Sequence, residues 1–144
     1  MVFQIRECRI EDADSIQQLN CNEMGYEYPY DETKNKLEHL LKSNKDKILV
    51  ATIQGVVVGY IHASDYDVIY APHMKNIMGI AVSSEYKKHG IGKTLVTGIE
   101  KWAKETGASG IRLISGSTRT GAHEFYRRCG YDGGKQQSNF KKYF

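Results

Sequence analysis

Apolar residues recur at two spacings along this chain, and the spacings predict its helices and strands. Helical spacing marks four segments. The first follows an expected N-cap at Asp12, and the second contains Leu37, Leu40 and Leu41. The third runs from Ile91 to Ala103, and the fourth ends at Gly130. Short apolar and β-branched runs predict strands at residues 2–5, 48–53, 56–61, 75–82 and 111–114. Helices and strands therefore alternate in a mixed α/β layer architecture.

Turn signals separate these segments. Gln54-Gly55 lies between two strand-like runs, and a glycine there suits the positive φ of a two-residue hairpin. In the tail, Gly133-Gly134 precedes the aromatic residues Phe140, Tyr143 and Phe144, which predicts a terminal hairpin. Residues 23–32 are rich in tyrosine and carboxylate and contain Pro29, so they predict a loop or a broken helix.

The composition is that of one soluble globular domain. The 144 residues are 40% apolar and 26% charged, and no apolar run approaches the roughly 20 residues that span a bilayer. Arg6, Glu7 and Arg9 interrupt the apolar start of the chain, so no signal peptide is expected there and we expect a cytoplasmic protein. The three cysteines are widely spaced and suggest neither a disulfide framework nor a zinc site.

Charge is distributed unevenly along the chain. Residues 1–72 contain 7 Lys/Arg and 12 Asp/Glu, whereas residues 73–144 contain 13 Lys/Arg and 5 Asp/Glu. This pattern favours an anionic ligand for the second half and a cationic ligand for the first. The basic residues are scattered and lack interleaved exposed aromatic residues, so neither nucleic acid nor membrane is expected as a partner.

A glycine turn in residues 82–94 is the main candidate for binding an anion. The apolar run ending at Val82 leads into Gly90 and Gly92, which have lysines on both sides, and a helical pattern follows. Glycine permits a positive φ and the close approach of a ligand. A helix that begins here directs unpaired amides and its positive dipole end toward an anion.

Two common nucleotide motifs do not match this turn. A nucleoside-triphosphate P-loop requires a glycine at the position of Lys87, and the dinucleotide fingerprint requires one at Leu95. A strand, turn and helix without any ligand remains an alternative on this short pattern alone.

Two longer strings resemble motifs of the GCN5-related N-acetyltransferase (GNAT) superfamily. The first is Val82-x-x-x-Tyr86-Lys87-Lys88-x-Gly90-Ile91-Gly92, which resembles the acyl-CoA motif Arg/Gln-x-x-Gly-x-Gly/Ala but has Lys87 at its first position. The second runs from Ala122 to Tyr131 and is similar to Ala-x-x-Phe-Tyr-x-x-x-Gly-Phe/Tyr. The resemblance implies one N-acetyltransferase domain over residues 1–144. Its fold would have a central mixed, mostly antiparallel sheet of six to seven strands, flanked by about four helices.

The resemblance also implies acetyl-CoA as co-substrate, without a metal. In this family the strand before the turn pairs its free backbone groups with the pantetheine arm, and the turn holds the pyrophosphate. The residues implied to bind the cofactor are Ile80, Ala81, Val82, Lys87, Lys88, His89, Gly90, Ile91, Gly92, Lys93, Thr94 and Ser117. Arg119 is a further candidate near Ser117.

Acetyl transfer in the family proceeds by direct attack of an amine on the thioester, and the resemblance assigns Tyr126 to protonating the leaving sulfur. A phenol stays protonated at neutral pH and suits this role. The position of the glutamate base of histone-type members is Asn76 here, which cannot accept the proton. Glu23, Glu27, His62 and Asp65 are alternatives, and so is deprotonation through ordered water.

The acceptor is expected to be a small, cationic primary amine, because the acidic and tyrosine-rich loop lies where the family shapes its acceptor cleft. The expected substrate-binding residues are Glu23, Tyr26, Glu27, Tyr28, His62 and Asp65. A non-catalytic acyl-CoA-binding module and a protein lysine or N-terminal acetyltransferase remain alternatives. A monomer and a homodimer are both compatible with the sequence.

Overall fold

The computed structural model describes all residues, 1–144, as two compact units, Met1–Arg112 and Leu113–Phe144. The first unit contains β1 (Gln4–Glu7), the 3₁₀ turn η1 (Ile10–Asp12), α1 (Ala13–Met24), α2 (Tyr30–Leu41), β2 (Asp46–Ile53), β3 (Val56–Tyr66), β4 (Met74–Val82), the 3₁₀ turn η2 (Ser84–Tyr86), α3 (Ile91–Glu105) and β5 (Ile111–Arg112). The second unit contains α4 (Thr120–Arg128). Each predicted helix is present, so the helical spacing is confirmed.

The sheet of the first unit has five strands in the order β1-β2-β3-β4-β5. The first four pair antiparallel, and β5 pairs parallel with β4. The predicted hairpin between β2 and β3 is confirmed, because Gln54 and Gly55 have φ values of 50° and 80°, both positive as a primed turn requires. The sheet is thus mixed and mostly antiparallel.

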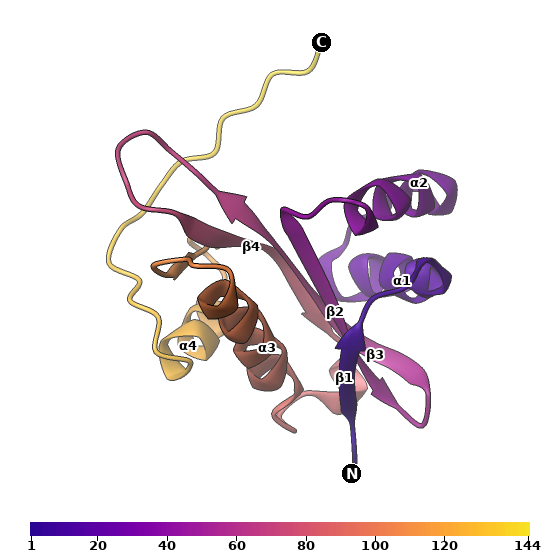
Figure 1. Ribbon diagram of the computed structural model, residues 1–144. Coiled ribbons are helices and arrows are strands. Elements are labelled where there is room, and N and C mark those ends of the chain that lie inside the picture. The colour runs from indigo at the N-terminus through magenta and orange to yellow at the C-terminus, as the bar shows by residue number, and fades with distance from the viewer. The chain divides into compact units, whose positions relative to one another are not determined.

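Helices cover both faces of this sheet (Figure 1). On one face, α1 and α2 bury apolar side chains against β2, β3 and β4, in a core that includes Ile16, Leu19 and Leu37. On the other face, α3 buries one stripe of residues, namely Ile91, Leu95, Val96, Ile99 and Ala103. Alternate residues of a strand point to opposite faces, so each strand side chain belongs either to the α1–α2 face or to the α3 face.

The expected N-cap role of Asp12 is wrong in detail. Its side chain makes no capping bond to α1. Instead its carboxylate accepts bonds from the Arg9 amide at 2.8 Å and from the Arg6 guanidinium at 2.8 and 2.9 Å. Asp12 is 6% exposed, and a buried carboxylate requires partners of this strength. The residue therefore stabilises the connection between β1 and α1.

We expect Asp12→Asn to destabilise the fold at neutral pH by about 1–3 kcal/mol, because charge-assisted bonds are lost. Burial raises the pKa of Asp12, but the bonds from Arg6 and Arg9 outweigh it and hold the pKa below the ordinary 3.8. The stabilisation is therefore complete above pH 3.8 and is lost as the pH falls through the lower pKa of the folded state. Urea unfolding should show that the difference in free energy of unfolding between wild type and variant decreases as the pH falls from 7 to 2. The exposed Asp14→Asn should show no such difference.

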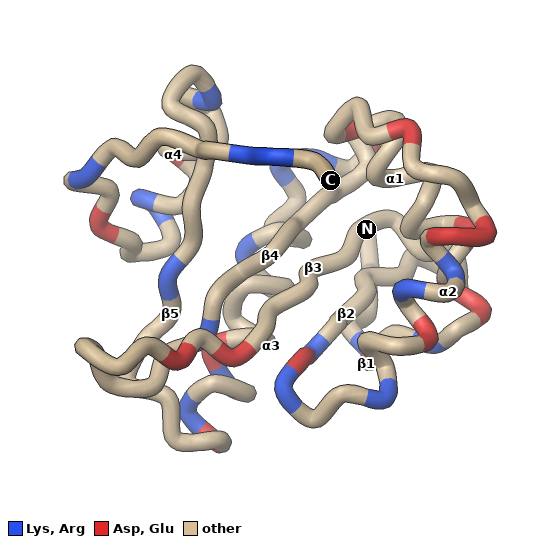
Figure 2. Tube along the Cα trace, turned by 90° about the horizontal axis from the view of Figure 1, so that it is seen from above, with Lys and Arg blue, Asp and Glu red and all other residues tan.

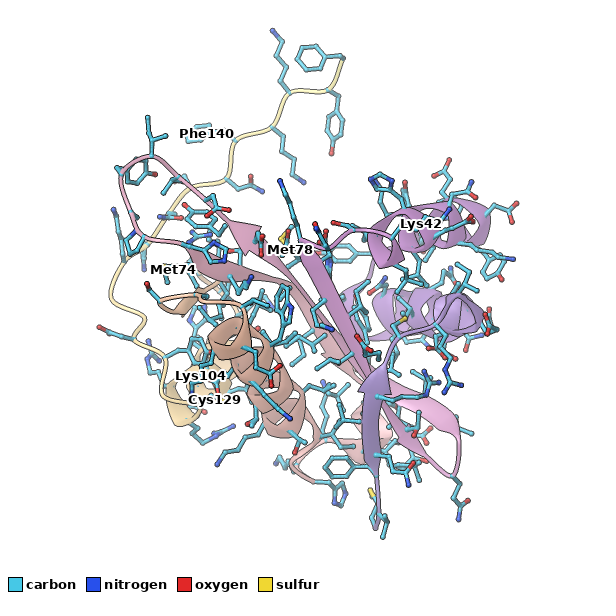
Figure 3. All side chains as sticks on the ribbon, in the orientation of Figure 1. Lys42, Met74, Met78, Lys104, Cys129 and Phe140 are labelled. Atoms are coloured by element: carbon cyan, nitrogen blue, oxygen red, sulfur yellow. The ribbon has the colours of Figure 1, made fainter.

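The second unit corrects two expectations. Residues 131–144 contain neither helix nor strand, so the predicted terminal hairpin is absent and the sheet has five strands rather than six to seven. In the tail, Gly133-Gly134 is followed by the polar run 135–139. The aromatic residues Phe140, Tyr143 and Phe144 are exposed, and Phe140 is labelled in Figure 3. The tail therefore lacks the alternating apolar face that stabilises a hairpin. Throughout the described chain, no helix is both long and apolar enough to cross a membrane.

Candidate active site

The glycine turn opens directly onto the start of α3. Lys88 and Gly90 have φ values of 68° and 83°, which turn the chain sharply between η2 and the helix. No side chain caps α3, and the first helical turn contains no acidic residue. The amides of Ile91, Gly92 and Lys93 therefore have no partner within the helix. A Cβ at Gly90 would meet no atom within 4 Å, so the space beside the turn is open to a ligand.

Positive charge surrounds these amides. Lys87, Lys88, His89 and Lys93 are all exposed. The hydroxyl of Thr94 donates to the Gly90 carbonyl at 2.8 Å, within the first turn of the helix. Unpaired amides, a helix dipole and exposed cations are together features that favour binding of a phosphate or pyrophosphate.

The strand before the turn has one unpaired edge. On one side, Ile80, Ala81 and Val82 pair with β3. On the other side, β5 pairs only with Lys75 and Asn76. The rest of β4 thus presents backbone groups to an extended ligand that can pair with a strand, as the amides of a pantetheine arm can. The three predicted residues lie along this edge.

An irregularity in β4 lies close to the same edge. The register with β3 shifts between His62 and Ala63, because Gly79 is opposite His62 and Ile77 is opposite Ala63. Met78, labelled on β4 in Figure 3, is the extra residue and is exposed. Such bulges re-aim backbone groups and often lie near functional sites.

Glu23 lies beside the glycine turn, although the sequence placed it in an acceptor loop. Its carboxylate accepts the Ser84 amide at 3.0 Å and lies 3.6 Å from the Lys87 ammonium. The Glu23 side chain is only 12% exposed. It therefore ties the end of α1 to η2 and orients Lys87. Sequence reasoning missed this contact because it joins residues 61 positions apart.

The other loop candidates are exposed. Tyr26, Glu27 and Tyr28 follow α1, and the tyrosines are 62% and 47% exposed. The loop is shorter than expected, because α2 already begins at Tyr30, after Pro29. Acidic residues occur on both α1 and α2 (Figure 2).

The two remaining acceptor candidates lie on opposite faces of the sheet. His62 is on the α1–α2 face, like Tyr60, which donates a hydrogen bond to Asn20 of α1. Asp65 is on the α3 face, where its carboxylate is 2.5 Å from the buried Lys75 ammonium. The structure thus places His62 beside the bulge of β4 and separates Asp65 from it.

The α1–α2 face carries further polar contacts near the bulge. Burial raises the pKa of the Tyr60 phenol to about 12, although its bond to Asn20 acts in the opposite direction. Asn76 of β4 accepts a hydrogen bond from Arg112, and that guanidinium stacks on the Tyr66 ring at 4.1 Å. Nothing in the sequence pattern links Arg112 to Asn76.

The second unit presents Tyr126 on α4. Its ring packs edge-on against Phe125 and Tyr131, with centroids 5.2 and 6.3 Å away. Burial raises the pKa of Tyr126 above its ordinary value of 10.0, while the charge of Arg119 lowers it in part. The phenol is therefore protonated at neutral pH and can donate a proton. Ser117 is exposed in the segment that precedes α4.

Over the whole described chain, no group of three or more His, Cys, Asp or Glu side chains is arranged to hold a metal ion.

Comparison with known proteins gives a consistent result. The family model described as "Acetyltransferase (GNAT) family" matches residues 12–131. The N-alpha-acetyltransferase of Sulfurisphaera tokodaii is 29% identical over 137 residues, which are 90% of this chain and 80% of that protein. An uncharacterized N-acetyltransferase of Methanocaldococcus jannaschii is 30% identical over 96 residues, which are 65% of this chain. That alignment covers only 42% of the Methanocaldococcus protein.

Solved structures show the same fold. The aminoglycoside N-acetyltransferase AAC(6')-Iy, solved in complex with CoA, superposes with a TM-score of 0.88 at 17% identity. The superposition covers 98% of this chain and 95% of that one. At this level of identity the likeness concerns the fold.

Proposed function

Because the chain belongs to the acetyltransferase (GNAT) family, we propose that it transfers an acetyl group from acetyl-CoA to a primary amine of a small cationic molecule. The observation that carries the proposal is the open, positively charged glycine turn beside an unpaired strand edge. The solved neighbour in complex with CoA supports the same donor.

On the donor side, the residues present fit coenzyme A. The amides from Lys88 to Lys93 would bind its pyrophosphate, with positive charge from Lys87, and the β4 edge from Ile80 to Val82 would bind its pantetheine arm. Thr94 and Ser117 are further candidates. Bound acetyl-CoA would supply an activated acetyl group as a thioester. Lysine cannot bind phosphate bidentately as arginine does, so the backbone amides would make most of the contacts.

On the acceptor side, negative charge supports a cationic amine. Glu27 is exposed on the loop after α1, and Asp31 and Glu32 lie in the first turn of α2. Exposed Tyr26 and Tyr28 add ring faces that attract cations. A solved neighbour is an aminoglycoside acetyltransferase, which is consistent with a small polycationic acceptor.

A second candidate acceptor is the α-amine of a peptide. The similarity to the N-alpha-acetyltransferase of Sulfurisphaera tokodaii, over 90% of this chain, favours it. The two candidate acceptors differ in size, because a peptide extends beyond its α-amine whereas a small amine does not. An assay that offers both classes of acceptor therefore separates the two candidates.

The proposed function is tested by incubating the chain with acetyl-CoA and an acceptor panel and following thiol release. The panel contains polyamines, aminoglycosides, peptides with an unblocked N-terminus, and neutral and anionic amines. Preferred turnover of small cationic amines is expected. Preference for peptides would establish the second candidate, and preference for neutral or anionic amines would exclude a cationic acceptor. Binding of acetyl-CoA without release of the coenzyme A thiol in the presence of any acceptor would identify a non-catalytic acyl-CoA-binding module.

We expect Gly90→Ala to weaken acetyl-CoA binding at least tenfold. The φ of 83° at Gly90 strains any residue with a Cβ by about 1–2 kcal/mol, and the added methyl group enters the space beside the unpaired amides. Isothermal titration with acetyl-CoA measures the effect. Gly55→Ala is the matched control, because Gly55 has a φ of 80° and the same open surroundings in a hairpin turn. Equal affinities for the two variants would exclude the glycine turn as the donor site.

A further inference from the structure

A histidine–carboxylate pair lies on the α1–α2 face of the sheet, next to the bulge of β4. The His62 Nε2 atom is 2.7 Å from Asp46 Oδ1, and the two side chains are 16% and 11% exposed. Asp46 opens β2, and bonds from His62, Ser43 and Ser64 lower its pKa although burial acts to raise it. The carboxylate is therefore ionised at neutral pH and held in one position.

The second ring nitrogen of His62 is available to a ligand. Nε2 is bonded to Asp46, whereas Nδ1 makes no hydrogen bond in the described chain and is not among its buried unpaired atoms. Directly across the sheet, His62 faces Gly79, which has no side chain to cover the ring. A carboxylate that fixes one nitrogen determines the tautomer and leaves the other nitrogen as a proton acceptor.

The charges around the ring favour this role. From β2, Asp46 is the ionised group in contact with it, while Gly79 and Met78 of β4 bring no titratable group. Along β3, Tyr60 is neutral, and its partner on α1 is the neutral Asn20. The cation of the same face, Arg112, is bonded to Asn76, which lies opposite Ser64. Asp46 thus stabilises the imidazolium that forms when Nδ1 accepts a proton.

We propose that His62 is the general base for the acceptor amine and that Asp46 is its positioning residue; this inference rests on the proposed function. His62 Nδ1 takes one proton from the acceptor ammonium, directly or through one water, and exposes the nitrogen lone pair. The amine then forms the N–C bond as the C–S bond breaks. The thiolate of coenzyme A takes up a proton as it leaves, and the second proton of the nitrogen is released to water. The imidazolium releases its proton to water.

The test is a pH series of kcat/KM for His62→Gln with the best acceptor of the panel. At pH 7 we expect a loss of about 100-fold, the lower end of general-base effects. The loss should shrink as the pH rises toward the ordinary pKa of an alkylammonium, about 10, since a neutral amine needs no base. His73→Gln is the matched control, because His73 Nδ1 is also 2.7 Å from a carboxylate, that of Asp67, on the β3–β4 loop. It should have no effect.

A loss that is equal at every pH, or no loss at all, would overturn the base role. Asp46→Asn provides a second test, independent of any folding defect in the first variant. It should move the acid limb of the kcat/KM profile to lower pH, because the imidazolium loses its carboxylate partner. If Asp46 had a purely structural role, the variant would reduce the amount of folded protein without moving the acid limb of the kcat/KM profile. If wild type releases no thiol with any amine, the proposed function fails. If wild type is active and the His62→Gln and Asp46→Asn variants have the same pH profile of kcat/KM as wild type, only the role of His62 fails.

Discussion

Tyr126→Phe is expected to lower kcat by 10²–10⁴-fold, the usual range for removing a general acid, and to leave acetyl-CoA affinity unchanged. The phenolic hydroxyl is the only group removed, so the ring keeps its packing against Phe125 and Tyr131. Because burial raises the pKa of Tyr126 above 10.0, the acid stays protonated throughout the neutral range. Steady-state kinetics with the best acceptor, together with titration of acetyl-CoA, measure the two effects separately.

Tyr143→Phe is the control for this experiment, since Tyr143 is 86% exposed in the tail. It should retain wild-type kcat. Wild-type turnover in Tyr126→Phe would remove the acid role, and equal losses in affinity and kcat would assign Tyr126 to binding instead. Neither result would alter the family assignment.

Asp65→Asn is expected to destabilise the fold by about 3–5 kcal/mol, the effect of removing one partner of a buried ion pair. Lys75 is only 2% exposed, and its ammonium lies 2.5 Å from Asp65 Oδ1 and 4.2 Å from the centre of the Trp102 ring. Without the carboxylate, the Trp102 ring would be the remaining partner of the buried Lys75 ammonium. Chemical denaturation at pH 7 measures the loss.

Lys75→Met distinguishes a buried charge from simple packing. It removes the cation and keeps an unbranched apolar side chain against Trp102, while Asp65 is 21% exposed and reaches water. We therefore expect a much smaller loss than for Asp65→Asn. An equal loss in both variants would mean that the pair acts through packing rather than through charge. Both variants should bind acetyl-CoA, because neither Asp65 nor Lys75 is among the proposed cofactor-binding residues.

Local patterns predicted the glycine turn and the elements on either side of it well. The glycines, the lysines and the apolar stripe of α3 are neighbours in sequence, so the strand, turn and helix follow from residues 75–105 alone. Gly90 adopts the positive φ that its position required. The hairpin at Gln54-Gly55 was predictable for the same reason, because turn chemistry is local.

Patterns predicted short and terminal elements less well. Strand β5 is only Ile111–Arg112, although the apolar run continues to Ile114. The tail forms no hairpin despite its glycines and aromatic residues, since a hairpin also requires a surface on which to bury one face. The residues of these two segments therefore do not by themselves decide how long the strand is or whether the hairpin forms.

The sequence by itself determined the family, the helices and the location of the glycine turn, because each depends on patterns among near neighbours in the chain. The tertiary structure decided where the residues predicted to bind the acceptor lie. Glu23 belongs to α1 and contacts Ser84 beside the turn, Asp65 lies on the α3 face, and His62 is bonded to Asp46 opposite Gly79. These pairings depend on strand register and on which face of the sheet each side chain occupies. A shift of one residue would reverse them.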